Sequence, residues 1–207
     1  MTNKTIEYYN ENAEAYSNST INLNLQNVYK DFLKSIPENG KILDVGCGSG
    51  RDSLHFKNLG YKVVALDASK ELAEKASKHI GQEVIVSKIE DITFKNSFDA
   101  VWCMASLVHL NNSELDIALE KISEAIKPQG SFYASFKVGE GEEIDSKNRY
   151  FNYIKEENIV ALLDKHKLGK NVSLNFTNDE LGRPTAWLNV YSSSEKPKLK
   201  NTLKNPL

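Results

Sequence analysis

Residues 44–50 have the sequence Asp-Val-Gly-Cys-Gly-Ser-Gly and lie between two segments of different character. Lys41–Val45 is apolar and typical of a buried strand, whereas the segment from about Arg51 to Leu59 has a helical pattern. Alternating glycines let the backbone turn sharply and approach a ligand closely. The helix that follows offers unpaired N–H groups and the positive end of its dipole. We expect the following residues to surround a bound ligand: Asp44, Gly46, Cys47, Gly48 and Gly50.

The next predicted strand, Tyr61–Asp67, identifies the kind of ligand. Asp67 follows Gly46 by about 20 residues, the spacing at which an acidic side chain binds a nucleoside ribose. Asp67 and the adjacent Ala68 are therefore predicted to contact a nucleoside-containing cofactor. Arg51 stands where the dinucleotide pattern G-x-G-x-x-G needs its third glycine, which disfavours a dehydrogenase. The P-loop pattern G-x-x-x-x-G-K-[ST] is absent from the sequence.

The run Asp44–Gly50 resembles motif I of the class I S-adenosylmethionine-dependent methyltransferases. Two later segments strengthen this resemblance. Ser97–Val101 resembles the fourth strand of that family, and Leu119–Ile126 with Lys127-Pro128-Gln129-Gly130 resembles its helix and "LKPGG" turn, with Gln129 in place of the first glycine. The resemblance covers residues 5–138 well and implies S-adenosylmethionine as the cofactor.

The resemblance also implies a fold: a doubly wound, seven-stranded Rossmann-like α/β sheet with helices on both faces. Its strand order is 3-2-1-4-5-7-6, with strand 7 antiparallel. Strand-like and helical segments alternate along the chain, which favours this class. The predicted strands are Lys41–Val45, Tyr61–Asp67, Glu83–Ser87, Phe98–Cys103, Ser131–Val138, Asn171–Phe176 and Pro184–Tyr191.

Residues 1–192 are expected to form one methyltransferase domain, in which residues 1–38 are an N-terminal helical lid. Ile6, Tyr9, Ala13 and Tyr16 recur at the spacing of one helical face. Further predictions are a helix near Ile154–Lys165, a hairpin of the last two strands, and a polar, flexible tail over residues 193–207.

Two details concern helix capping and a loop. Ser113-x-x-Asp116 resembles a capping box, followed by an apolar face of Leu115, Leu119, Ile122 and Ile126. Gly139–Arg149 is predicted to be an acidic loop.

Composition restricts the class of protein. A chain of 207 residues with a formal charge of −2 is an ordinary single domain without electrostatic attraction for nucleic acid. Its two cysteines and the lack of a signal peptide or membrane span predict a cytoplasmic protein. A monomer or a homodimer is expected. No Asp, His or Cys cluster has the spacing of metal ligands, so catalysis without a metal is expected.

Further cofactor contacts follow from the resemblance. It places Tyr16 in a helix that covers the cofactor, and Arg51 near the carboxylate of its methionine part. Cys103 and Met104 are implied beside the sulfonium centre and adenine. The usual acidic contact to the adenine amino group corresponds here to Lys88, and Glu90 and Asp91 are the residues that could replace it. Ile89 is also expected to contact the cofactor. A solvated acidic loop is the competing interpretation.

The acceptor is expected to lie between the N-terminal helices and the 139–149 loop. The candidate contacts are Tyr8, His109, Arg149 and Phe151. His109 is either a general base or a structural histidine, and Arg149 either binds an acidic acceptor or pairs with the acidic loop. Core packing is the competing interpretation for the N-terminal tyrosines.

The leading hypothesis is a methyltransferase acting on a small molecule. Gly50-Arg51-Asp52-Ser53-Leu54 and Arg149-Tyr150-Phe151 resemble the tellurite-resistance methyltransferase group. Four acidic residues between Glu140 and Asp145 are expected beside the acceptor mouth, where they would repel a phosphate backbone. The alternatives are a methyltransferase of RNA, DNA or protein, and a cofactor-binding regulator without turnover.

Overall fold

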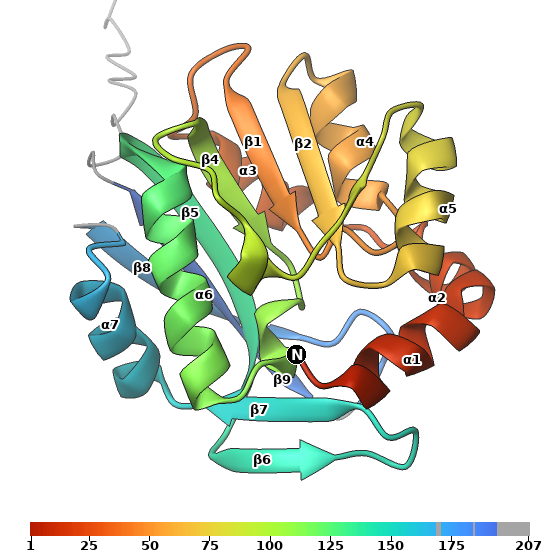
Figure 1. Ribbon diagram of the computed structural model, residues 1–207. Helices are drawn as coiled ribbons and strands as arrows, with labels where there is room; N and C mark the ends of the chain where they lie inside the picture. The colour runs from red at the N-terminus through yellow and green to blue at the C-terminus, as the bar shows by residue number, and fades with distance from the viewer. Residues whose placement is uncertain (169–170, 184, 194–207) are drawn as a thin grey trace, which may run out of the picture.

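A computed structural model of the protein describes residues 1–168, 171–183 and 185–193. A central sheet lies between two layers of helices (Figure 1). The predicted fold class is confirmed. The prediction of a flexible tail falls on residues outside the described ranges, apart from Ser193, which ends the last strand.

The sheet has nine strands among the described residues. Their bounds are β1 Lys41–Val45, β2 Lys62–Asp67, β3 Ile85–Val86, β4 Phe98–Cys103, β5 Ile126–Val138, β6 Gly141–Ile144, β7 Tyr150–Ile154, β8 Asn171–Asn178 and β9 Ala186–Ser193. The helices are α1 Asn3–Glu11, α2 Ala13–Thr20, α3 Gln26–Leu33, α4 Arg51–Asn58, α5 Lys70–Ile80, α6 Asn112–Ala125 and α7 Glu156–Lys165. Two short 3₁₀ turns are η1 Ile89–Asp91 and η2 Leu107–His109.

The strand order follows the prediction. The first five strands are parallel in the order β3-β2-β1-β4-β5. β9 then pairs antiparallel with β5, from Ser131↔Ser193 to Lys137↔Trp187, and β8 pairs antiparallel with β9. The predicted hairpin of the last two strands is therefore confirmed, and β8 and β9 correspond to strands 6 and 7 of the expected sheet.

A β6–β7 hairpin was not predicted. β7 runs parallel to the end of β5 at Lys137 and Val138, along the edge that β4 leaves free after Cys103. β6 then pairs antiparallel with β7, so the prediction of a loop over residues 139–149 is wrong for residues 141–144. All four residues of β6 are exposed, and no alternation of buried side chains marks them as a strand. In Figure 1 the hairpin lies across the carboxyl ends of the parallel strands.

The two helical layers follow from which side chains of the sheet each layer buries. Trp102 of β4 and Tyr133 of β5 pack against Phe32 of α3 and Phe56 of α4. The residues that alternate with them, such as Phe132, face α6 and α7 on the other side. α5 packs on β2 through a smaller cluster that includes Ala65.

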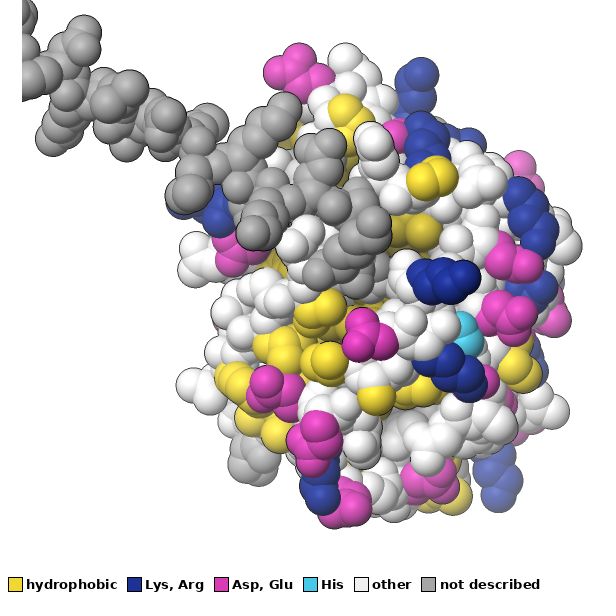
Figure 2. Space-filling view, turned by 90° about the vertical axis from the view of Figure 1, so that its left-hand side faces the viewer, with side chains coloured by type: hydrophobic (Ala, Val, Ile, Leu, Met, Phe, Trp, Pro, Cys, Tyr) yellow, Lys and Arg dark blue, Asp and Glu magenta, His cyan; other side chains and the backbone are white. Residues whose placement is uncertain are grey.

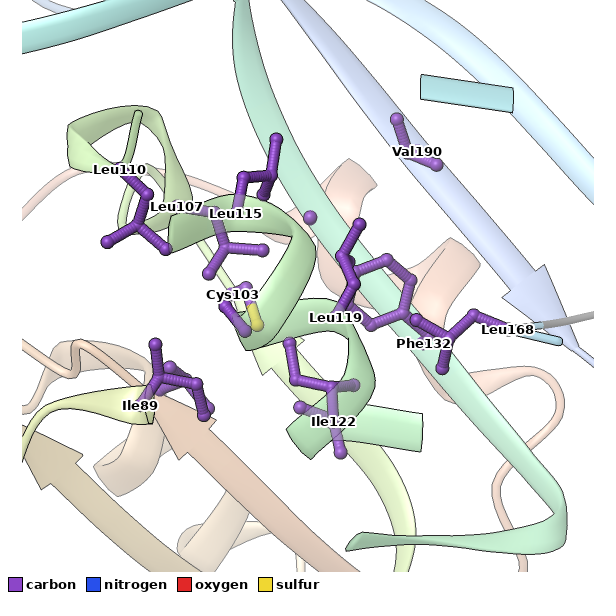
Figure 3. Packing of buried hydrophobic residues seen from close by; sticks show 14 of the residues in the cluster. Ile89, Cys103, Leu107, Leu110, Leu115, Leu119, Ile122, Phe132, Leu168 and Val190 are labelled. Carbon is purple, nitrogen blue, oxygen red and sulfur yellow. The ribbon is translucent and has the colours of Figure 1, made fainter. Parts of the chain in front are cut away.

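The apolar face of α6 was predicted from its periodicity. Leu115, Leu119 and Ile122 point into the core beside Phe132 and Val190 (Figure 3). The predicted capping box is displaced by two residues. Its members are Asn111, whose side chain accepts the Glu114 N–H, and Glu114, whose carboxylate accepts the Asn111 N–H. Asp116 instead binds Lys165 and His166 next to α7.

The N-terminal segment forms two helices rather than one, with the break at Asn12. Two hydrogen bonds hold α1 over the carboxyl ends of the strands. Thr5 Oγ1 accepts the backbone N–H of Tyr150 in β7 at 3.0 Å, and Ser69 Oγ donates to Asn10 Oδ1 at 2.7 Å. α1 therefore bridges the start of α5 and the β6–β7 hairpin, and closes one side of the space above the sheet.

No helix among the described residues is long and apolar enough to cross a membrane. The outer strand β8 leaves the Phe176 side chain 58% exposed. Figure 2, which faces this side of the molecule, shows hydrophobic side chains gathered on the surface.

We predict that Leu119→Ala lowers the free energy of unfolding by about 2–5 kcal/mol, because a fully buried leucine leaves a cavity in the core. Ile117→Ala is a matched control in the same helix, since Ile117 is 44% exposed, and it should change stability by less than about 0.5 kcal/mol. Urea denaturation of both variants measures the difference. Equal losses in the two variants would contradict the assigned orientation of α6.

Candidate cofactor and acceptor site

The glycine turn after β1 lies against the end of β2. The N–H groups of Gly46 and Cys47 both donate to the Leu66 carbonyl oxygen, at 2.8 and 3.0 Å. Gly46 has φ +69°, and a Cβ there would lie 2.5 Å from the Cβ of Ser106. Glycine is therefore required at this position both by conformation and by space.

Asp67 holds the next part of the turn. Its Oδ2 accepts the Gly48 N–H at 2.9 Å, and its Oδ1 accepts the Ser69 N–H at 2.8 Å. Burial raises the pKa of the Asp67 carboxyl to about 6, while the N–H groups of Ser69, Gly48 and Ala68 oppose this rise. Because an ionised carboxylate has about four acceptor positions, Asp67 retains capacity for ribose hydroxyls.

A cavity of about 630 Å³, counted with its open part, lies above Asp67. It collects seven of the residues predicted for the cofactor: Tyr16, Gly46, Gly48, Asp67, Ala68, Ile89 and Glu90. Lys88 and Ser106, which the sequence did not assign to the site, also line it. Glu90 Oε2 and Ser106 Oγ are buried without a hydrogen-bond partner, so this cavity offers free polar atoms to a nucleoside ligand.

The remaining predicted cofactor residues lie elsewhere. Asp44 is buried beneath the turn, where Ser53 Oγ donates to it at 2.6 Å. Burial, together with the charge of Asp52, raises the pKa of Asp44 to about 8. Gly50 is the N-cap of α4. Asp91 and Cys103 line neither cavity of the site, and Cys103 is packed in the core below α6 (Figure 3).

A larger cavity of about 1820 Å³, counted with its open part, adjoins the first. Cys47, Arg51 and Met104 line it, and so do all four residues predicted for the acceptor: Tyr8, His109, Arg149 and Phe151. Its floor comes from β5 and β9. Ser135 is opposite Asn189 in the strand register and Lys137 is opposite Trp187, and all four side chains line the cavity.

The predicted acidic mouth does not form. Glu140, Glu142 and Glu143 are absent from the lining, and Asp145 forms a salt bridge of 2.7 Å with Arg149. The hairpin strand β6 carries Glu142 and Glu143 away from the cavity, because it pairs along the outer edge of β7, and Glu140 forms a salt bridge with Lys155. Cations line the cavity instead, and sequence analysis missed three of them: Lys137, Lys147 and Arg183.

The two cavities share part of their lining. The residues common to both are Tyr9, Tyr16, Gly46, Gly48, Ala105 and His109. A cofactor in the smaller cavity and an acceptor in the larger one would therefore meet at this shared wall. Tyr9 is the one member of the pair Tyr8-Tyr9 that faces both cavities, and sequence analysis did not list it among the site residues.

Tyr9 and His109 form a hydrogen-bonded pair within the shared wall. His109 Nδ1 lies 2.7 Å from the Tyr150 carbonyl oxygen, which can only accept, so Nδ1 carries the proton. Nε2 is then the acceptor of the Tyr9 hydroxyl at 2.9 Å. Burial lowers the pKa of His109 to about 4 and raises that of Tyr9, so both side chains are neutral near pH 7.

Arg51 is engaged by protein groups. Its Nε and one terminal nitrogen donate to the two oxygens of Asp52, at 2.6 and 3.0 Å, and its other terminal nitrogen donates to the Thr20 carbonyl at 3.1 Å. Asp52 also accepts from Tyr29 Oη and Trp102 Nε1. The arginine therefore ties α2 to the start of α4.

The described residues contain no group of three or more His, Cys, Asp or Glu side chains that could hold a metal ion.

Part of the chain is similar to known proteins. Residues 42–130 match the family described as "Methyltransferase domain". Uncharacterized protein MJ1252 of Methanocaldococcus jannaschii is 33% identical over 129 residues, 61% of this chain and 49% of that protein. The ubiquinone biosynthesis O-methyltransferase of Xanthomonas axonopodis pv. citri is 33% identical over 106 residues, 48% of this chain and 44% of that enzyme. The chain thus spans about half the length of these relatives.

The fold is shared with 1,6-didemethyltoxoflavin-N1-methyltransferase of Burkholderia thailandensis, solved with 1,6-didemethyltoxoflavin and S-adenosylhomocysteine bound. That likeness has a TM-score of 0.69 at 16% identity, over 91% of this chain and 84% of that chain. Residues 42–130 are therefore similar to a methyltransferase domain, and S-adenosylmethionine is the cofactor that this similarity indicates. The glycine turn, Asp67 and the unpartnered atoms of Glu90 and Ser106 fit this cofactor.

We predict that binding of S-adenosylhomocysteine weakens as pH falls. The ionised form of Asp67 is the stronger acceptor for ribose hydroxyls, so affinity should drop as pH falls below the Asp67 pKa of about 6, by at most about tenfold per pH unit. Calorimetry at pH 7.5 and pH 5 measures this change. Asp67→Asn should bind more weakly at pH 7.5 and lose most of the dependence. A wild-type affinity that stays constant over this range would remove Asp67 from the contact.

Proposed function

We propose that this chain is an S-adenosylmethionine-dependent methyltransferase whose acceptor is a small molecule. The observation that carries the proposal is the shared wall of the two cavities, which contains Tyr9, Ala105 and His109. It would let an acceptor in the larger cavity face the reactive end of a cofactor in the smaller one. The ubiquinone biosynthesis and toxoflavin relatives, whose names give small-molecule acceptors, support the same class of acceptor.

In this proposal the cofactor contacts are shared among three elements. Asp67 accepts hydrogen bonds from the ribose hydroxyls, Glu90 and Lys88 lie near the base, and Tyr16 covers the bound cofactor from α2. The segment Gly50–Leu54, which resembles the tellurite-resistance group, supports assignment to methyltransferases of small molecules. Arg51 donates hydrogen bonds to Asp52 and to the Thr20 carbonyl at the end of α2. It therefore positions α2, the helix that covers the cofactor, rather than the cofactor itself.

The protein has little covalent chemistry to perform. S-adenosylmethionine supplies a methyl group already activated on a positively charged sulfur. The residues of the shared wall align the acceptor with that methyl group, and α1 and α2 keep water out of the junction. Binding and alignment by this chain would then provide most of the acceleration.

An acceptor with an O–H or N–H group must also lose a proton, and Tyr9 and His109 are placed to take it. The Tyr9 oxygen accepts the acceptor proton while its own hydroxyl proton moves to His109 Nε2. The Tyr150 carbonyl accepts a hydrogen bond from Nδ1–H and so stabilises the imidazolium that results. The lowered pKa of His109 keeps its Nε2 free of a proton at neutral pH, so Nε2 can accept one.

Transfer of label tests the function. We expect purified protein with methyl-labelled S-adenosylmethionine and a metabolite extract to place label in small molecules, and a parallel reaction with total RNA, DNA and protein to leave the polymers unlabelled. Label confined to RNA or protein would contradict the small-molecule proposal. Tight binding of S-adenosylhomocysteine without transfer to any fraction would instead favour a cofactor-binding regulator.

We predict that Tyr9→Phe and His109→Gln each lower kcat by about 10²–10⁴-fold for an oxygen or nitrogen acceptor, because a positioned proton acceptor contributes that much. Tyr153→Phe is the control, since that hydroxyl binds Glu143 on the hairpin surface, and it should leave kcat unchanged. The dissociation constant of S-adenosylhomocysteine, measured for each variant, checks that the cofactor cavity is intact. Wild-type kcat in Tyr9→Phe would exclude the proton relay.

A further inference from the structure

The larger cavity is lined by more cations than carboxylates. Besides Arg51, the cations are Lys137, Lys147, Arg149 and Arg183. They come from the end of β5, from the turn of the β6–β7 hairpin, and from the connection between β8 and β9. The sheet order brings these distant segments to one mouth.

The carboxylates near this mouth are largely occupied by protein donors. Asp52 accepts from Arg51, Tyr29 and Trp102, and Asp179 accepts from Arg183 and Trp187. Asp145 binds two nitrogens of Arg149, at 3.0 and 2.7 Å. Glu180 is exposed. These carboxylates therefore neutralise Arg51, Arg149 and Arg183. Among the described residues, none of them forms an ion pair with Lys137 or Lys147.

Lys137 is the cation best placed for a ligand. It is half-buried, and within the described part of the chain no carboxylate lies within ion-pair distance of its ammonium. Its Nζ lies 3.3 Å from the centroid of the Phe151 ring, an arrangement that fixes the ammonium over the cavity. Burial lowers the pKa of Lys137, with the charges of Arg149 and Arg183 acting in the same direction and Glu143 opposing them.

The position of Lys137 relative to the Tyr9–His109 pair is also defined. The Phe151 ring under its ammonium lies 4.7 Å from the His109 ring, centroid to centroid. Arg149 lies over the same Phe151 ring at 5.0 Å and over Tyr8 at 4.9 Å. A charged group held at Lys137 would therefore be within the length of one small molecule from the Tyr9–His109 pair.

We propose that the methyl acceptor carries an anionic group, a carboxylate or a phosphate, which binds the ammonium of Lys137. The proposal rests on the methyltransferase function above and adds the chemical class of the acceptor. Lys147 and Arg149 add positive potential at the same mouth. The other end of the acceptor then points toward the shared wall.

Binding of probe anions tests this directly. Benzoate and phenyl phosphate are the two anionic probes, and benzamide is the neutral isostere of benzoate. Calorimetry is performed on the whole chain saturated with S-adenosylhomocysteine, so that the carboxylate of the cofactor cannot occupy the anion position. A hydrogen bond to a charged group predicts that at least one anion binds about tenfold or more tightly than benzamide.

Lys137→Met should abolish this preference, because it keeps the stem of the side chain over Phe151 but removes the charge. Lys41→Met is the matched control: Lys41 also places its ammonium over a ring, 4.8 Å from the Phe98 centroid, but at the first residue of β1. This variant should retain the preference. An unchanged affinity for S-adenosylhomocysteine in Lys137→Met shows that the fold and the cofactor cavity are intact.

The proposal is overturned if wild-type protein binds neither anion better than benzamide, or if the preference persists in Lys137→Met. Comparison of benzoate with phenyl phosphate separates the two sources of negative charge. The proposed function fails separately, if the wild-type chain does not bind S-adenosylhomocysteine in the same calorimeter.

Discussion

The site depends on the turn after β1 lying flat against the end of β2. Two N–H groups of the turn bind the Leu66 carbonyl and a third binds Asp67, so three donors fix the backbone. Only glycine at position 46 leaves room for Ser106, and a Cβ at Gly48 would lie 3.1 Å from the Tyr16 ring. This close contact lets segments after β4 and from α2 meet above the sheet, and both cavities form around that meeting point.

Much of the fold could be predicted from sequence because its signals are local. The strand before Gly46, the acid at the end of β2 and the periodic leucines of α6 each need only their neighbours in the chain to be recognised. Resemblance to a family then supplied the strand order, which local patterns cannot give. The glycine turn and Asp67 consequently lie together, as the sequence suggested.

The lining of the larger cavity was harder to predict, because several of its residues lie in the connections between strands, whose conformation the sequence pattern does not reveal. The strand β6 is exposed and short, so only its pairing with β7 defines it, and that pairing carries the glutamates away from the mouth. Lys137 shows no signal in sequence, because its role arises from Phe151 in another strand. Arg51 was expected near the carboxylate of the cofactor, but its guanidinium binds the neighbouring Asp52 instead. Comparison of motifs does not reveal this competing contact.

A crystal structure of the chain with S-adenosylhomocysteine would show whether the glycine turn and Asp67 hold the cofactor. We expect ribose hydroxyls on Asp67, the base near Glu90 and Ile89, and the sulfur atom at the wall shared with the larger cavity, beside Tyr9 and Ala105. Clear density for the ligand outside the smaller cavity, or with its sulfur directed away from Tyr9 and His109, would contradict this expectation.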